Sequence, residues 1–493
     1  MPEPLDSFLP TIGLEVHAEL LTRSKMFCGC AVVDSTAAEP NSSTCEICTG
    51  MPGTLPVINQ RAVEYALRVA LALNCTVAET SVFARKNYFY PDLPKGFQIS
   101  QYELPLAQSG WLAVELDQGE LRIGIRRVHL EEDTGKLLHR EGYSLVDYNR
   151  SGVPLLEIVS EPEMHSVEEV KAYSAGLRSL LRYLDVNSGD MQKGTMRFEA
   201  NVSLRRRESD PLGTRTEIKN LNSFRAVTRS IAYELERQAV ALSQGLRIAQ
   251  ETLGWDESRE VTVPQRGKEE ADDYRYFPEP DLPPLHVSAA WIEEVRRSLP
   301  ELPSARRERF IREYGLSRYA ARVLTEEQAV AEYFESTLRS GDGLAPEKAA
   351  AWITGELFGL LNQAALPIEA AQVSPEALAE LVGLVESGQI SMASGKLVLE
   401  EIFQHGGNPA EVVSARGLLQ LSDTEAIGSL VQQVLQENPQ QVAQYLAGKT
   451  TIAQWFVGQI MRKSGGTADP AVVKPTLEAA LQSLQHKENR ESA

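Results

Sequence analysis

The sequence lacks the features that would place it in a membrane or send it out of the cell. No stretch approaches the roughly 18 consecutive apolar residues of a membrane-spanning helix. Residues 1–10 (MPEPLDSFLP) are acidic and proline-rich. They lack the basic start of a secretory signal and the arginine- and serine-rich pattern of a transit peptide. We therefore expect a cytoplasmic location.

The sequence also lacks a standard phosphate-binding loop and an amidase signature. The only candidate for the loop is 448–450 (GKT), and Ala443 stands where a P-loop would have its first glycine. The nearest match to an amidase run of the Gly-Gly-Ser-Ser-Gly-Gly type is 464–466 (SGG). We therefore expect that the chain alone does not release ammonia from glutamine, and that any nucleotide is held by other groups.

Excess positive charge is missing from the chain as a whole. The net charge is −19, which argues against broad non-specific binding of nucleic acid. The charge is uneven, however, because residues 193–229 hold nine Lys or Arg against four Asp or Glu. Composition therefore permits RNA to be held locally but does not establish it.

The 493 residues, 43% of them hydrophobic, suffice for about three domains. Up to about Leu285 the chain shows period-two alternation and many Gly or Pro breaks, which indicate short strands interrupted by helices. Beyond it, long amphipathic runs predict helices, with a further break at 405–409 (HGGNP). We expect an α/β class: a mixed α/β domain with antiparallel strands over 1–290, a helical domain over 291–405 and a small helical tail domain over 406–493.

Five predicted strands carry an unusual polar face. Because alternate side chains share a face, the polar faces hold Glu15, His17 and Glu19; Arg127, His129, Glu131 and Asp133; Glu157 and Glu161; Arg197, Glu199, Asn201 and Ser203; and Arg215, Glu217 and Lys219. The solvent side of a half-buried antiparallel sheet is polar anyway, which is the alternative interpretation. The repeated carboxylates beside Arg, Lys and imidazole instead favour one shared site.

Mg²⁺ takes oxygen ligands and usually binds one or two carboxylates together with phosphate oxygens. Glu131 and Glu157, helped by His17, suit that task, and Glu15 is a candidate for a second ion. Lys86, Lys95, Arg197 and Lys219 are candidate cations for neutralising phosphate charge. His17 or His129 could instead act as a base. We favour metal ligation for His17 and leave His129 unassigned.

Four of the five cysteines form two close pairs, Cys28 with Cys30 and Cys45 with Cys48. Two such pairs fit a closed, tetrahedral zinc site, and a reducing cytoplasm makes disulfides unfavourable. The alternative is four free thiols. Cys75 follows an apolar helical run and is expected to be a small buried hydrophobe.

Taken together, the motifs resemble one family, the B subunits of the aspartyl/glutamyl-tRNA(Asn/Gln) amidotransferases. The motifs are 13–17 (GLEVH), 85–96 (RKNYFYPDLPKG), 129–136 (HLEEDTGK), 147–157 (DYNRSGVPLLE), 217–223 (EIKNLNS) and 273–281 (DYRYFPEPD). They are long, ordered and spread over the catalytic half. The helical remainder is similar to the family's middle and tail.

The resemblance implies a cradle-shaped catalytic domain with kinase and transamidase activities. In the family, ATP phosphorylates the side-chain carboxylate of Glu-tRNA(Gln) or Asp-tRNA(Asn), and ammonia then displaces phosphate. It also implies a heterotrimer with an amidase A subunit and a small C subunit, and a tail that contacts tRNA.

The family's magnesium ligands fall on His17, Glu131 and Glu157, with Glu15 near a second ion, and its zinc ligands fall on the four paired cysteines. Because side chains alternate along a strand, Glu131 and not its neighbour Glu132 is expected on the polar face, and we choose Glu131 as the ligand. Glu199 stands where the family more often has Asp, and Thr467 and Asp469 replace Lys and Asn in the tail.

The segment 85–102 mixes aromatic and basic residues. It could line the nucleotide or acceptor-end site, since aromatic rings stack on bases, or it could be a packed loop held by Pro91 and Pro94.

Two other functions of the chain also remain as alternatives. One is a non-catalytic, zinc-stabilised scaffold that binds tRNA. The other is a metal-dependent phosphohydrolase, which would need no helical tail.

Overall fold

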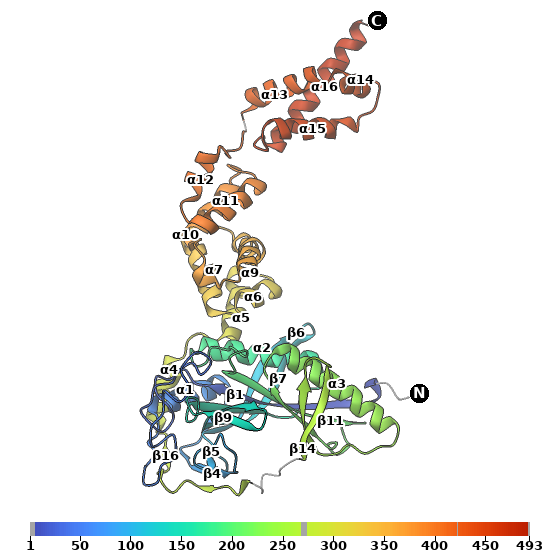
Figure 1. Cartoon of the computed structure of the whole chain (residues 1–493). Helices are drawn as coiled ribbons and strands as arrows, with labels where there is room; N and C mark the ends of the chain where they lie inside the picture. Colours follow the sequence, from blue (N-terminus) through green and yellow to red (C-terminus); the bar gives the residue numbers. More distant parts are fainter. Residues whose placement is uncertain (1–4, 268–273, 422, 492–493) are drawn as a thin grey trace. The chain divides into compact units, whose positions relative to one another are not determined.

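The computed structural model describes residues 5–421 and 423–491 with the exception of 268–273 (Figure 1). Asp273, the first residue of the motif at 273–281, lies outside the described residues. The chain divides into two compact units, Met1–Arg306 and Arg307–Ala493. No helix in the described part combines the length and apolar character needed to cross a bilayer.

The first unit is built on a nine-stranded sheet. Its strands lie in the order β14 (Val261–Gly267), β13 (Glu251–Asp256), β12 (Thr216–Leu221), β11 (Met196–Arg205), β1 (Leu9–Glu19), β10 (Pro154–Ser160), β7 (Gly119–Glu132), β6 (Ala107–Leu116) and β2 (Thr76–Val77). All neighbours are antiparallel except β12 and β13. Strand β1 is therefore central, with β10 on one side and β11 on the other.

One face of this sheet is covered by helices. In β1, Ile12, Leu14 and Val16 are at most 1% exposed, because period-two alternation places them all on the helix side. Helices α2 (Val167–Tyr183) and α3 (Phe224–Ser243) lie together along that face (Figure 1). Helix α1 (Gln60–Ala72) packs against β7 and α4 (Ala289–Ser298). The opposite face of the central strands is left to polar side chains.

A second, three-stranded sheet of β15 (Phe277–Pro278), β4 (Phe83–Asn87) and β5 (Phe97–Gln101) is fastened to the end of β7. Gln101 accepts a hydrogen bond from Leu130 N at 3.0 Å, and Gln98 donates to the Glu132 carbonyl at 2.7 Å. These buried side chains replace the ladder bonds of a continuous sheet, and they hold the segment that carries Lys86 beside β7.

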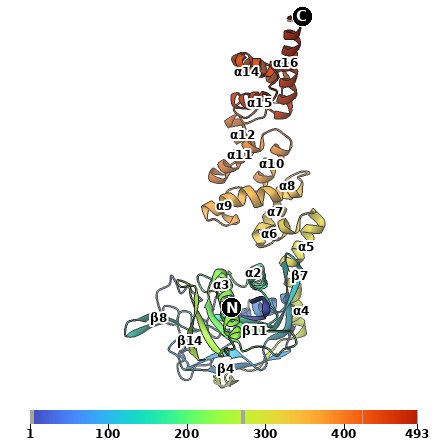
Figure 2. The same ribbon diagram turned by 90° about the vertical axis from the view of Figure 1, so that its right-hand side faces the viewer.

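Two short pairings complete the unit. Strand β3 (Thr80–Ser81) pairs with β16 (Leu285–His286). The hairpin of β8 (Lys136–Arg140) and β9 (Tyr143–Asp147) projects from the body of the unit (Figure 2). Its exposed side chains include Tyr143 and Leu145.

The second unit is helical. After α5 (Pro303–Tyr314), in which the division between the units falls, come α6 (Arg318–Leu324), α7 (Gln328–Ser340), α8 (Pro346–Ala351), η3 (Trp352–Leu357), α9 (Phe358–Ala364), η4 (Ile368–Ala370), α10 (Pro375–Glu386), α11 (Met392–His405), α12 (Pro409–Arg416), α13 (Thr424–Glu437), α14 (Pro439–Leu446), α15 (Ile452–Lys463) and α16 (Pro470–Glu491). The predicted class, a mixed α/β domain followed by helices, is confirmed.

The described residues form three hydrophobic cores. One belongs to the first unit, one gathers residues between Phe310 and Val413, and one gathers residues between Ile427 and Leu481. Helix α4 packs on α1 in the first unit, so the first boundary of the structure follows Arg306. The three-domain division, with its edges at 290 and 405, stays a prediction.

Candidate active site and cysteine centre

The central strand β1 brings acidic residues of both neighbouring strands together on the polar face of the sheet. Its register pairs His17 with Glu157 of β10, and Glu157 in turn with His129 of β7. His17 Nε2 lies 3.3 Å from Glu157 Oε2 and 3.6 Å from Glu131 Oε1. Ligand atoms of His17, Glu131 and Glu157 all lie within 4.8 Å of one another. We call these three residues the histidine cluster.

Burial and mutual charge decide the protonation of this cluster in the absence of metal. Burial lowers the pKa of His17, but the hydrogen bond and charge of Glu157 outweigh it and raise the pKa to about 9. Burial also opposes ionisation of Glu157, yet His129, His17 and Lys86 hold its pKa well below the usual range. The pKa of Glu131 is raised by burial and by Glu157. The positive charge of protonated His17 therefore offsets part of the negative charge of the two carboxylates.

A second group of acids lies on the other side of β1. The register pairs Glu15 with Glu199 of β11, and Asn201 with Glu217 of β12. Ligand atoms of Glu15, Glu199 and Glu217 lie within 4.8 Å of one another, and Asn201 donates to Glu15 at 3.0 Å. We call Glu15, Glu199 and Glu217 the carboxylate cluster. Burial, followed by repulsion from Glu157 and the other two acids, raises the pKa of Glu15 to about 7.

Three of the four predicted phosphate-binding cations lie at these clusters. Lys219 Nζ is 2.9 Å from Glu199 and 3.7 Å from Glu217. Arg197 bonds Asp133 at 2.8 Å, next to the histidine cluster in the register of β1. Lys86 is half-buried, and the charges of Tyr276, Glu131 and Glu157 outweigh the cost of desolvation and raise its pKa well above the usual range.

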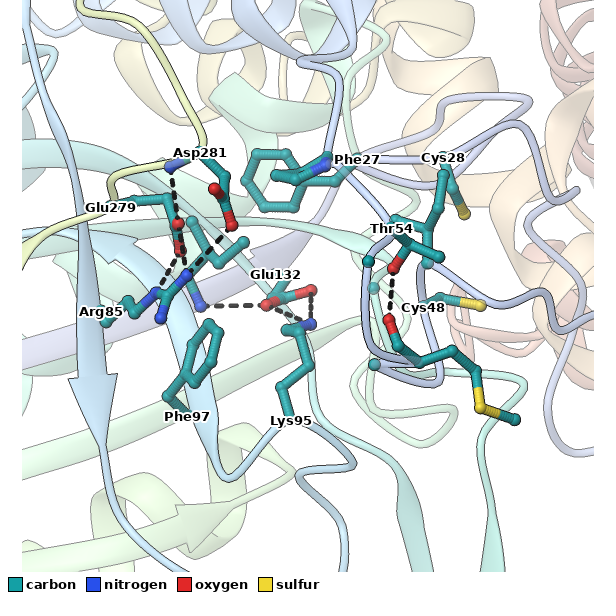
Figure 3. Close-up of a pocket in the computed structure, with 17 residues that line it drawn as sticks. Phe27, Cys28, Cys48, Thr54, Arg85, Lys95, Phe97, Glu132, Glu279 and Asp281 are labelled. Atoms are coloured by element: carbon teal, nitrogen blue, oxygen red, sulfur yellow. Dashed lines mark hydrogen bonds and ion pairs between the residues drawn. The ribbon is translucent and has the colours of Figure 1, made fainter.

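The fourth predicted cation, Lys95, lies elsewhere. Its Nζ is 2.7 Å from Glu132, whose carboxylate also accepts from Ile99 N at 2.9 Å. Glu132 thus points away from the face that carries Glu131, as alternation requires. The pair lies in a cavity of about 210 Å³ (Figure 3). Cys28 and Cys48 line one side of this cavity, and Arg85, Glu279 and Asp281 line the other.

Aromatic rings stand beside Lys86, and they come from two distant segments. The Lys86 ammonium lies 5.1 Å from the centre of the Tyr274 ring, and Tyr102 stacks on Tyr276 at 4.1 Å. Tyr88 meets Tyr274 edge to face. The segment 85–102 therefore contributes both a packed aromatic wall and a cation to the neighbourhood of the histidine cluster.

His129, left unassigned by sequence, is 2% exposed and lies 3.5 Å from Glu157. Burial is the main reason why its pKa is lowered to about 4, with further lowering by Arg127 and Lys86. Among the described residues its Nδ1 has no hydrogen-bond partner. His129 is therefore neutral near pH 7 and packs against a carboxylate of the cluster.

The four paired cysteines converge at one point in the first unit. All four are free, and their sulfur atoms lie within 4.8 Å of one another. A turn over Cys45–Cys48, in which Cys45 N donates to the Cys48 sulfur at 3.2 Å, supplies one pair. A hydrogen bond from Cys28 lowers the pKa of Cys48 to about 4. The group could bind a structural metal, whereas Cys75 is isolated and buried.

Sequence reasoning missed the part played by three residues at these clusters. Glu217 was placed on a polar face but not named as a ligand, and no role was assigned to Glu199. Side-chain alternation identified both polar faces, but only strand order reveals that β11 lies next to β1, with β12 directly after it, rather than beyond β7. Asp133, which bonds Arg197 and approaches Arg150 at 3.7 Å, was missed for the same reason.

Comparison with known proteins agrees with this geometry. The model of the GatB/GatE catalytic domain matches residues 10–293, and the model of the GatB domain matches 332–481. Three relatives, each named as the B subunit of an aspartyl/glutamyl-tRNA(Asn/Gln) amidotransferase, match nearly the whole chain. They come from Roseiflexus sp. (strain RS-1), 50% identical over 96% of this chain and 98% of the relative; Moorella thermoacetica, 51% over 95% and 99%; and Myxococcus xanthus, 48% over 97% and 99%. The chain therefore belongs to the family of the B subunits of aspartyl/glutamyl-tRNA(Asn/Gln) amidotransferases.

Proposed function

We propose that this chain is the subunit of a glutamine-dependent, tRNA-dependent amidotransferase that uses ATP to activate the side-chain carboxylate of Glu-tRNA(Gln) or Asp-tRNA(Asn). The observation that carries the proposal is the pair of acid clusters on either side of β1, with Lys86, Arg197 and Lys219 beside them. Family membership supports the choice of substrate class, because the relatives' names specify these tRNAs.

The donor sets fit hard divalent cations. His17, Glu131 and Glu157 would hold one magnesium ion, and Glu15, assisted by Glu199 and Glu217, would hold a second. When bound, magnesium neutralises charge on the phosphates of ATP. In its absence the proton on His17 and the raised pKa of Glu15 relieve the repulsion among the acids.

The chain's own cations would serve the phosphoryl group as it moves. A carboxylate oxygen of the aminoacyl side chain attacks the γ-phosphorus, and the bond to the β-phosphate oxygen breaks, which gives an acyl phosphate and ADP. Charge neutralisation and positioning are the main requirements of this step. Lys86 interacts electrostatically with Glu131 and Glu157, and Lys219 Nζ lies 2.9 Å from Glu199, so each suits a different part of the triphosphate.

Ammonia completes the reaction. Its nitrogen attacks the carbonyl carbon of the acyl phosphate, phosphate leaves, and one proton is lost to give the amide. Without an amidase signature of its own, the chain would receive ammonia from an amidase A subunit, and a small C subunit would complete a cytoplasmic heterotrimer. The helical tail at 406–493 would contact tRNA, and the four cysteines would hold structural zinc.

One assay separates this function from its alternatives. ATP consumption and amide formation are measured with Glu-tRNA(Gln), the amidase and small subunits, and ammonia, for the native chain and for Glu157→Ala. We expect both activities in the native complex and neither in the variant. A non-catalytic tRNA scaffold predicts no difference between the two proteins. A phosphohydrolase predicts ATP turnover without tRNA, which would overturn the proposal.

A further inference from the structure

A buried lysine lies against the cysteine centre. Lys25 is 0% exposed and is among the largest fully buried side chains of the molecule. Its Nζ donates to the Cys48 sulfur over 3.6 Å and to the Tyr148 carbonyl over 3.1 Å. No carboxylate among the described residues forms an ion pair with it. An ammonium group without a carboxylate partner is costly to bury, unless another anion compensates it.

The cysteine centre supplies that anion. Four thiolates around a divalent cation leave a net negative charge, because each thiolate carries one charge. The other lysine and arginine of the adjoining cavity already have carboxylate partners, Lys95 with Glu132 and Arg85 with Glu279. Lys25 is thus the cation placed to offset the negative charge of the metal-bound cysteine centre.

The same lysine contacts the loop that leads into β10. Gly152 has φ +86°, and a Cβ there would lie 3.4 Å from the Cys48 Cβ and 3.5 Å from the Lys25 Cδ. Ser151 donates to the Cys48 carbonyl at 3.2 Å, and Met26 N donates to the Gly152 carbonyl at 2.7 Å. The loop at 148–153 is therefore packed directly on the centre.

That loop is also bonded to the chain directly after β7, the strand that carries Glu131. Gly152 N donates to the Asp133 carbonyl at 2.9 Å, and Arg150 donates to the carbonyls of Thr134 and Gly135, both at 3.0 Å. Directly after the loop, β10 begins at Pro154 and places Glu157. A change at the centre can therefore move the connection between β7 and β10.

We propose that Lys25 is a positioning residue of the cysteine centre: it stabilises the metal-bound thiolates by charge and hydrogen bonding, and it ties the loaded centre to the loop at 148–153. The proposal rests on the metal-binding role given to the cysteines under the proposed function. Outer partners of metal ligands commonly tune affinity in this way.

The test is zinc affinity of the full chain, measured by competition with a chromophoric chelator. Lys25→Met keeps the length and apolar character of the buried stem and removes the ammonium. We expect zinc affinity to fall about 10-fold to 100-fold. With Co²⁺, the sulfur-to-metal charge-transfer band should shift to lower energy, because the thiolate loses a hydrogen bond. Lys171→Met, on the exposed face of α2, makes the same charge change and should alter neither quantity.

Hydrogen exchange of the 147–153 peptide tests whether the metal-bound cysteine centre stabilises the loop at 148–153. We expect faster exchange when zinc is removed from the native chain, and in Lys25→Met even with zinc bound. Unchanged zinc affinity in Lys25→Met overturns the role of Lys25, whereas a native chain that binds no zinc overturns the metal centre itself. Reduced affinity with unchanged exchange overturns the tie to the loop. If Lys25→Met does not fold, Lys25→Gln is measured against the same outcomes.

Discussion

The histidine cluster has two carboxylates and an imidazole, the carboxylate cluster has three carboxylates, and their negative charges are compensated differently. In the histidine cluster, His17, His129 and Lys86 keep the pKa of Glu157 well below its usual range despite burial. In the carboxylate cluster Lys219 is shared between Glu199 and Glu217, and the pKa of Glu15 rises to about 7. Each group therefore holds an ionised carboxylate, Glu157 in the first and Glu199, whose pKa Lys219 lowers despite burial, in the second. Glu157 is held by three basic side chains, those of His17, Arg127 and His129, whereas Glu199 is held by Lys219.

This difference gives the two groups different expected contributions to activity. A charged ligand fixed in advance costs no reorganisation when phosphate charge develops. Protons on His17 and on Glu15 must both leave before these side chains bind metal, so the difference between the groups lies in how firmly the ionised carboxylate is held. We therefore expect the histidine cluster to be indispensable and the carboxylate cluster to adjust the rate.

The largest effect is expected for Glu157→Gln, which removes the ionised ligand and leaves the amide in the same space. Amidation by the complete complex should fall by about 10²-fold to 10³-fold or more, as measured with ammonia as the nitrogen source. Glu161→Gln is the matched control, because Glu161 pairs with Arg126 at the surface and should keep activity near the native value. Equal losses in the two variants would contradict a special role for Glu157.

A smaller loss is expected for Glu217→Gln in the carboxylate cluster. Activity should fall about 10-fold to 100-fold, and raising the magnesium concentration should restore part of it, because the remaining acids still attract the ion. Magnesium titrations at fixed ATP measure this, with Glu208→Gln, an exposed change of the same charge, as control. If Glu217→Gln were as inactive as Glu157→Gln at every magnesium concentration, the two groups would not differ as described.

Replacing Glu15 should make the metal-free chain more stable, whereas the two preceding substitutions lower activity. The folded pKa of Glu15 lies above its ordinary value of 4.5, so folding loses stability as pH rises from 4.5 to about 7. Glu15→Gln should therefore stabilise the chain in a metal chelator at pH 8, by about 1–3 kcal/mol, with little effect at pH 4. Chemical denaturation at both pH values measures the change. A destabilised variant at pH 8 would show that Glu15 is not repelled by its neighbours.

The smallest effect is expected for Glu199→Asp, which installs the residue that is commoner in the family. The charge is kept while the carboxylate retreats by one methylene from Lys219, now 2.9 Å away. Activity should change less than about 5-fold, since surroundings and charge are preserved. Comparing the magnesium dependence of this variant with that of Glu217→Gln separates ligand position from ligand charge within one cluster.

Strand parity allowed much of the site to be predicted from sequence. His17, Glu131 and Glu157 lie on faces that alternation alone identifies, and the choice of Glu131 over Glu132 matches the side on which the cluster forms. The spacing of Cys28, Cys30, Cys45 and Cys48 likewise predicted a group of four thiols. These patterns are local, so a single sequence carries them.

What sequence alone determined, then, is which side chains share a face, which segments are strands or helices, and which cysteines come in pairs. Only the tertiary structure decided that β1 lies between β10 and β11, that Glu199 and Glu217 therefore join Glu15, and that Lys25 is buried against Cys48. The physical reason is range: alternation follows from the geometry of neighbouring peptide units, whereas strand order and the burial of a lysine depend on packing between segments far apart in the chain.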